Sequence, residues 1–176
     1  MKRISVVLAA ALFLLTGCYG GDPNMAAKVG DVVITEQELD ASWEAIRPLN
    51  LVSDRTQLFK VALVGLILDN IESPTVQAAV TEEDLESVYT ELAVGEFSKQ
   101  PDTADISRAL GVYVLLQSIV SADDGLEVLE AVNAEIVSVS ETVELNPRYG
   151  EWDPSNYTFS GSGALATPIP TAEAAG

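Results

Sequence analysis

The stretch "ELNPRYGEWDP", residues 144–154, differs from the rest of the chain. It places an arginine, a tyrosine and a tryptophan between two prolines, after a long region rich in alanine, valine and acidic residues. Bulky, rigid side chains so near the C-terminus either form a ligand site or close a fold. We favour the second interpretation, in which these side chains pack on the start of the domain. The fold-closing motif comprises Asn146, Pro147, Arg148, Tyr149, Gly150 and Trp152.

The spacing of hydrophobic residues changes shortly before this motif. Helical spacing continues to about Val139, whereas the alternation that follows is typical of a strand. Glu141 interrupts an alternating pattern that could otherwise extend further back. We therefore expect a strand from about Thr142 to Asn146, which Pro147 ends because proline donates no ladder hydrogen bond.

A hairpin is predicted at the other end of the domain. Two β-prone runs, 26–29 and 32–34, flank Gly30 and Asp31, and glycine at the first central position suits a type II′ turn. A hairpin alone is marginal in water, and a third strand makes it stable. The family resemblance of these two ends, given below, implies that the late strand returns to this hairpin, with Val143 and Leu145 beside Val29 or Ile34.

In that arrangement Arg148 has two kinds of partner within reach. Its guanidinium could lie over the ring of Tyr149 or Trp152. It could instead pair with the carboxylate of Glu36, Glu151 or Asp153. We expect order to end at Asp153-Pro154.

Five helices are predicted between the hairpin and the late strand. Thr35 opens the first with a capping box, and Pro48 ends it. The second is apolar on all sides over residues 61–68, so it should be the buried central helix. Gly65 at its centre costs roughly 1 kcal/mol relative to alanine, which close helix packing would justify. The second helix begins after its cap Asp54 and spans about 55–72, and the third begins after Thr81. The fourth spans about 105–121, and Ser121–Asp124 cap the fifth.

The expected fold is therefore mostly α, a bundle of about five helices with a short antiparallel sheet made of the N-terminal hairpin and the C-terminal strand. Residues 26–154 form this domain, about the size that supports one modest core. Residues 155–176 are rich in Gly, Ser, Ala, Thr and Pro, lack periodicity, and are expected to form a disordered tail.

The first 17 residues have the parts of a secretory signal peptide: Lys2 and Arg3, a short apolar run, and small residues. The apolar run is shorter than the roughly 20 residues that a spanning helix needs. "LTGC", which ends at Cys18, resembles the lipobox of bacterial lipoproteins. The resemblance implies cleavage between Gly17 and Cys18, acylation (palmitate included) of that cysteine, a tether over 18–25, and a lipid anchor on the extracytoplasmic face of the cell membrane. Cys18 is also the only cysteine, so no internal disulfide is possible.

Composition excludes several functions. The 9 Lys and Arg of the chain fall to 7 without Lys2 and Arg3, against 27 Asp and Glu, which gives a charge of −20. Such a surface argues against binding nucleic acid, whose phosphates require cations. It equally argues against docking on anionic lipid through protein charge.

The chain contains no histidine. This excludes Ser-His-Asp and Cys-His catalysis and histidine-ligated zinc. No glycine-rich phosphate loop is present, and Asp123-Asp124-Gly125 lacks the alternating ligands of a calcium loop. We therefore expect no catalytic residues, no metal and no cofactor.

Two segments carry a resemblance to a known family. "AAKVGDVVITEQEL", residues 26–39, resembles the opening of the SurA N-terminal domain family, the chaperone part of exported SurA- and PrsA-like prolyl isomerases. "VELNPRYGEWDP", residues 143–154, is similar to the closing strand and turn of actinobacterial lipoproteins that carry this domain, and "VTEEDLESVY" from Val80 is similar to its third helix. The parvulin domain and its histidines are missing, so the resemblance does not extend to prolyl isomerisation.

The resemblance implies a membrane-anchored, chaperone-like module that binds unfolded or extended segments of exported proteins. The alternative is an envelope lipoprotein that uses the same fold to dock one specific partner. Four aromatic residues are candidates for a surface that binds clients: Trp43, Phe59, Phe97 and Tyr113. For each of them we favour a place in the core over a place on that surface.

Overall fold

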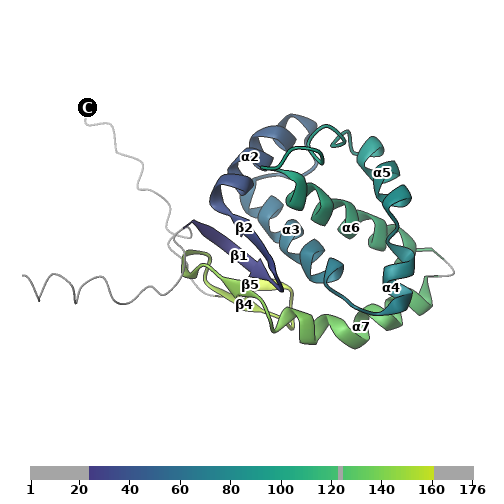
Figure 1. The fold of residues 1–176 in the computed structure, drawn as a ribbon. Helices are drawn as coiled ribbons and strands as arrows, with labels where there is room; N and C mark the ends of the chain where they lie inside the picture. The colour runs from purple at the N-terminus through teal and green to yellow at the C-terminus, as the bar shows by residue number, and fades with distance from the viewer. Residues whose placement is uncertain (1–23, 123–124, 161–176) are drawn as a thin grey trace, which may run out of the picture.

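The structure, a computed structural model, describes residues 24–122 and 125–160 (Figure 1). It confirms the expected class: helices dominate, and a small antiparallel sheet joins the N-terminal hairpin to a C-terminal strand. The strands are β1 Met25–Val29, β2 Val32–Thr35, β3 Glu144–Leu145, β4 Glu151–Asp153 and β5 Thr158–Ser160. The helices are α2 Glu36–Ile46, α3 Arg55–Asp69, α4 Pro74–Ala79, α5 Glu82–Glu91, α6 Ala104–Val120 and α7 Leu126–Ser140, with 3₁₀ turns at Arg47–Leu49 and Pro147–Tyr149.

The hairpin forms as its sequence predicts. Gly30 has φ +57° and Asp31 is not in the positive-φ region, which is the pattern that a type II′ turn requires. β1 is the middle strand of the order β2-β1-β3, so the N-terminal strand is completed only by residues from the other end of the domain.

The late strand is shorter than expected. β3 covers only Glu144–Leu145, and Leu145 pairs with Ala27 rather than with Val29. Ala27 also pairs with Ile34 on its other side, so Leu145 and Ile34 lie in one row across the sheet. The ladder ends where Pro147 begins a 3₁₀ turn.

Side-chain caps begin three of the six described helices, α2, α3 and α5. The side chain of Thr35 accepts a hydrogen bond from the backbone N–H of Glu38, whose carboxylate accepts one from the N–H of Thr35 at 2.7 Å. The side chains of Asp54 and Thr81 likewise accept a hydrogen bond from the backbone N–H three residues later in the chain. The predicted cap at Ser121–Asp124 is wrong, because Ser121 ends α6 and Gly125 precedes α7; positions 123–124 lie outside the described residues.

Two elements were not predicted. The short helix α4 follows Ser73 and has Pro74 in its first turn, a position that proline favours. The hairpin β4–β5 contradicts both the end of order at Pro154 and a disordered tail from residue 155, since Trp152 pairs with Phe159. The remaining tail, 161–176, lies outside the described residues.

Helix α3 is the centre of the bundle, as its all-round apolar sequence predicts. It packs against β1, α2, α6 and α7, and in Figure 1 the other elements surround it. At Gly65 its backbone lies against the backbone of Ala109 in α6, where a methyl group would overlap the carbonyl of Ala109. Gly65 is therefore required by the close approach of these two helices.

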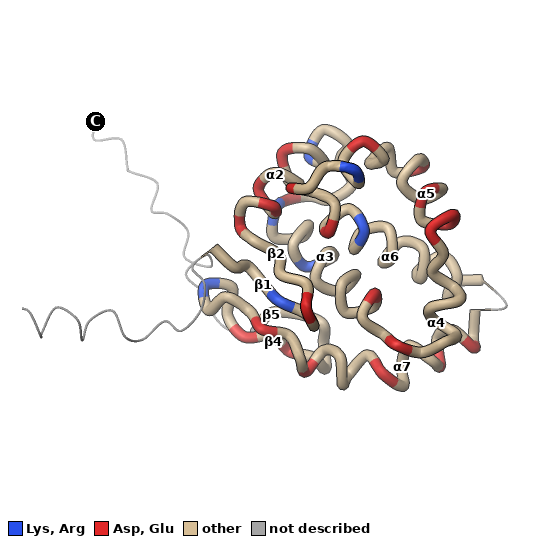
Figure 2. The backbone as a smooth tube through the Cα atoms, in the orientation of Figure 1, with Lys and Arg blue, Asp and Glu red and all other residues tan. Residues whose placement is uncertain are grey.

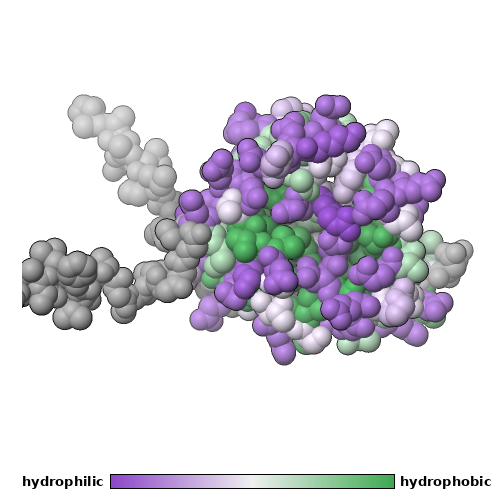
Figure 3. Space-filling view, in the orientation of Figure 1, coloured by the Kyte–Doolittle hydropathy of each residue, from purple (hydrophilic) through white to green (hydrophobic). Residues whose placement is uncertain are grey.

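The charged residues lie on the outside of the bundle. Figure 2 shows Asp and Glu on α2, α5 and α7, with few Lys or Arg between them. Figure 3 shows one face, on which hydrophobic residues gather near the centre and hydrophilic side chains cover the rest. The acidic surplus thus belongs to solvated helix faces.

We expect Gly65→Ala to destabilise the domain by at least about 2 kcal/mol, because the new methyl group meets rigid backbone rather than a side chain that can turn away. The measurement is urea unfolding followed by circular dichroism. Gly95→Ala is the matched control: its added methyl group would meet nothing within 4 Å, and its stability should stay within about 0.5 kcal/mol of the parent. Equal stability of the two variants would contradict the close approach of α3 to α6.

Candidate functional site: an apolar groove beside a charged cluster

The fold-closing motif lies against the start of the domain, as predicted. The backbone N–H of Asn146 donates to the carbonyl of Ala26 at 3.0 Å, and its side-chain amide donates to the carbonyl of Met25 at 2.8 Å. Gly150 has φ +92°, a conformation that glycine adopts without strain, and it turns the chain into β4. The two ends of the domain are therefore joined by direct hydrogen bonds.

Tyr149 lies at the centre of this junction. It is buried, and its hydroxyl lies 2.9 Å from both carboxylate oxygens of Glu36. Arg55 donates to the same carboxylate at 2.7 Å and to the hydroxyl of Tyr149 at 2.9 Å. Arg148 also pairs with Glu36 and lies over the Tyr149 ring, 5.4 Å from its centroid. We call Glu36, Asp40, Arg55, Arg148 and Tyr149 the closing cluster.

The expected partners of Arg148 are thus confirmed for Glu36 and Tyr149. Arg55 was not predicted, because nothing in the sequence distinguishes it from a solvated arginine in the first turn of a helix. Burial pulls the pKa of the Arg55 guanidinium down, but hydrogen bonds to Tyr149 and Asp40 outweigh burial and leave the pKa raised. Both oxygens of Glu36 are occupied, and arginine cannot act as a general base. The cluster joins α2, α3 and the closing motif.

Aromatic rings continue this junction into the core. The Phe59 and Tyr149 ring centroids are 4.3 Å apart, and those of Phe59 and Phe159 are 5.4 Å apart. The indole N–H of Trp152 donates to the hydroxyl of the buried Ser140 at 2.7 Å. Phe159 falls in the segment that we expected to be disordered, although its alternation with Tyr157 after the turn-forming sequence "DPSN" was a signal for a strand.

A second charged cluster ties three helices together. Arg108 of α6 donates to both carboxylate oxygens of Asp69 in α3, at 2.8 and 3.1 Å, and to Glu82 of α5 at 2.8 Å. The hydrogen bonds to Asp69 raise the pKa of Arg108. This arrangement is structural as well, because each charge is paired within the fold.

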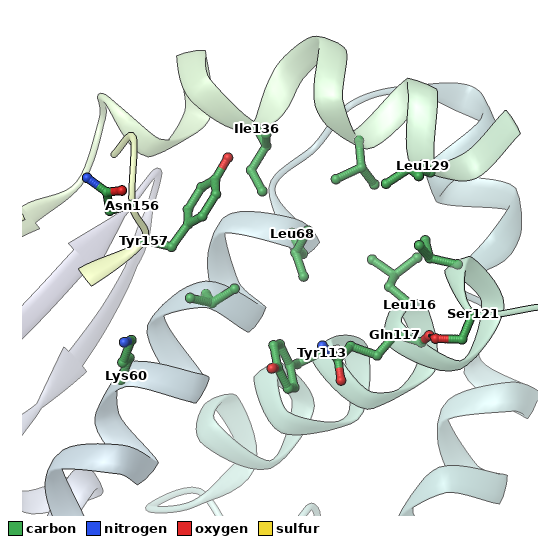
Figure 4. Close-up of a pocket in the computed structure, with 13 residues that line it drawn as sticks. Lys60, Leu68, Tyr113, Leu116, Gln117, Ser121, Leu129, Ile136, Asn156 and Tyr157 are labelled. Carbon is green, nitrogen blue, oxygen red and sulfur yellow. Dashed lines mark hydrogen bonds between the residues drawn. The ribbon is translucent and has the colours of Figure 1, made fainter. Parts of the chain in front are cut away.

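An open groove of about 450 Å³ lies between α3, α6, α7 and the turn before β5 (Figure 4). It opens to solvent and is lined mainly by apolar side chains at helical spacing. They come from α3 (Val64, Leu68), α6 (Tyr113, Leu116, Val120) and α7 (Leu129, Val132, Ile136), with Lys60, Gln117, Ser121, Asn156 and Tyr157 around them.

One wall of the groove is the turn between β4 and β5. A carboxylate oxygen of Asp153 accepts hydrogen bonds from the backbone N–H of Ser155 at 2.9 Å and of Asn156 at 3.3 Å, which holds the turn. The hydrogen bond from the Asn156 side chain is the main cause that lowers the pKa of Asp153. Tyr157 then takes a positive φ of 47° and its ring stands over the groove (Figure 4). A segment that the sequence assigned to the tail thus forms part of the candidate site.

The candidate client residues are not gathered in one place. Phe59 is fully buried in the core, while Trp43 and Phe97 are partly buried and do not line the groove. Tyr113 alone of the four lines it. Cys18 and Gly17, the proposed lipidation and cleavage residues, lie outside the described residues.

No group of three or more Asp, Glu, His or Cys side chains within residues 24–122 and 125–160 is arranged to hold a metal ion. None of the helices in these ranges combines the length and the apolarity that crossing a membrane needs. A second hollow of about 330 Å³ is lined by residues that include Gly30, Asn70 and Glu135, and Glu135 accepts a hydrogen bond from the backbone N–H of Glu72 at 3.1 Å.

Comparison of the chain with protein-family models, with curated proteins and with solved structures found no match.

We expect Glu36→Gln to destabilise the fold by roughly 2–3 kcal/mol, because it leaves two partly buried arginines without their shared carboxylate. Glu144→Gln is the matched control. Glu144 meets Lys28 at 3.5 Å with 65% of its side chain exposed, so its loss should change stability by less than about 0.5 kcal/mol. Thermal and urea unfolding at neutral pH measure both. Equal effects would mean that the closing cluster contributes no more than a surface pair.

Proposed function

We propose that this chain is a lipid-anchored, extracytoplasmic module that binds extended apolar segments of exported polypeptides without catalysing a reaction. The open apolar groove between α3, α6 and α7 carries this proposal. Its volume lies within the range typical of ligand sites, and apolar lining with few polar groups favours an apolar ligand. The resemblance of residues 26–39 and 143–154 to the SurA N-terminal domain family supports a polypeptide as that ligand.

The chemistry of the groove favours weak and sequence-tolerant binding. Its apolar lining is made of leucine, valine, isoleucine and tyrosine, which offer contact area without directional bonds. Met25, the single methionine after Cys18, lies in β1 and not at the groove. Adaptability must therefore come from the openness of the groove rather than from methionine side chains.

The proposed anchor would hold the groove near the membrane. Six residues lie between Cys18 and Met25 at the start of β1, so their Cα atoms are seven residue steps apart. An extended chain of that length spans at most about 25 Å. A lipid on Cys18 would therefore keep the domain at the surface where exported segments emerge.

We expect Cys18→Ser to move the protein from the membrane fraction to the soluble fraction and to abolish incorporation of labelled palmitate, because two or more acyl chains are needed for stable anchoring. Fractionation of cells that express the full-length chain measures both effects. Substitution of the neighbouring Thr16→Ser is the control and should change neither. A variant without Cys18 that stays in the membrane fraction would contradict the anchor.

We expect Leu129→Gln to weaken binding of an unfolded polypeptide about fivefold, since it removes roughly 1 kcal/mol of apolar contact from the groove. Leu126→Gln is the matched control: Leu126 lies on the same helix, is 63% exposed and does not line the groove. The measurements are peptide binding by fluorescence anisotropy and suppression of aggregation of several unrelated reduced proteins by light scattering.

The same experiment separates the two candidate functions. Suppression of aggregation for several unrelated proteins, lost in the Leu129 variant alone, would support the chaperone-like function. No suppression, together with recovery of one specific protein in pull-down, would favour a docking lipoprotein instead.

A further inference from the structure

The cations of this acidic protein are almost all paired. Across residues 24–122 and 125–160, each arginine and Lys28 contact a carboxylate within 4.0 Å, whereas Lys60 and Lys99 do not. The pairs are Lys28–Glu144, Arg47–Glu44, Arg55–Glu36 and Asp40, Arg108–Asp69 and Glu82, and Arg148–Glu36. An anion that approaches the described part of this acidic chain, whose full net charge is −18, therefore finds two cations there with no carboxylate already bound.

One of these two lysines lines the groove. Lys60 belongs to the first turns of α3 and lies at the end of the groove beside Asn156 and Tyr157 (Figure 4). Its ammonium makes a long hydrogen bond of 3.4 Å to the hydroxyl of Thr158. Two of its three N–H donors are thus available, next to a surface that is otherwise apolar.

The rest of the groove continues from Lys60 along one face of α3. Val64 and Leu68 follow at intervals of four residues, so the floor extends about 12 Å from Lys60. An extended peptide rises about 3.3 Å per residue, and about four residues therefore fill this length. On the α6 side Gln117 lines the groove, and its side-chain amide has no hydrogen-bond partner among the described residues.

We infer that the groove binds the apolar C-terminal end of a polypeptide, with the terminal carboxylate at Lys60, about four side chains along α3, and a peptide group at the amide of Gln117. This inference rests on the proposed function and specifies its ligand. The charge pattern carries it, because a carboxylate is repelled by the acidic surface everywhere except at an unpaired cation. A fatty acid shares the carboxylate and the apolar body, but its chain offers no partner for Gln117.

The test compares two forms of one labelled octapeptide made of leucine, valine and alanine, with a free C-terminal carboxylate or with a C-terminal amide. Both are titrated against the full-length chain, in lipid nanodiscs if it is membrane-bound and in buffer otherwise, with anisotropy as the readout. We expect the carboxylate form to bind about fivefold more tightly at low salt, the upper range for an exposed ion pair. The preference should shrink as salt is added.

Three variants assign that preference to one residue. Lys60→Gln should abolish it while leaving the affinity for the amide form unchanged, and Lys60→Arg should retain it. Lys99→Gln is the matched control, because Lys99 is also unpaired but does not line the groove. It should bind both peptides as the parent does.

The outcomes distinguish this inference from the function on which it rests. Equal affinity for the two peptides, or a preference that survives in Lys60→Gln, overturns the inference and leaves the polypeptide-binding function standing. Displacement of the carboxylate peptide by laurate at lower concentration than by unlabelled peptide overturns it in favour of an acyl ligand. Failure of both peptides to bind overturns the inference and the proposed function together.

Discussion

One carboxylate holds the two ends of this domain together. Glu36, the first residue of α2, is contacted by Arg55 at the start of α3 and by Arg148 and Tyr149 of the closing motif. The acceptor and its donors lie in three separate segments, α2, α3 and the closing motif, so the bonds form only when all three segments have reached their places. The exposed fraction of the Glu36 side chain is 14%, which keeps water from replacing those bonds. A neutral side chain there would remove the carboxylate that Arg55 and Arg148 share and leave Arg55 with Asp40.

The central helix depends on a different constraint, which is steric. α3 contacts α6 so closely at Gly65 that only a glycine fits against the carbonyl of Ala109. α7 lies further from both helices, and that unequal spacing leaves the groove between them. The tight contact and the open groove are therefore two consequences of one bundle geometry: α3 and α6 form the rigid floor, and α7 with the β4–β5 turn forms the rim.

Local chemistry predicted much of this fold. The caps at Thr35, Asp54 and Thr81 and the glycine turn at Gly30 depend on a few adjacent residues, whose preferences are strong. The return of the closing strand is a long-range pairing, which the family resemblance implied and local preferences did not. The spacing of α7 from α3 and α6 depends on tertiary packing, and residues such as Leu68 and Leu129 have the same helical pattern whether they face a core or a groove. The sequence did not predict that Arg55 contacts Glu36 and Tyr149, because these are long-range contacts. It also did not predict the hairpin that contains Phe159, because the composition of that segment resembles a linker.

The position of β1 within its sheet has a consequence for how the chain is made. The hydrogen bond between Asn146 and Met25 joins residues 121 positions apart, so the ribosome must synthesise nearly the whole domain before the sheet can be completed. Until then β1 has one bare edge, and such an edge is a template for pairing with another nascent chain. Mutual repulsion between strongly acidic copies, at −18 each, would oppose that pairing during the wait.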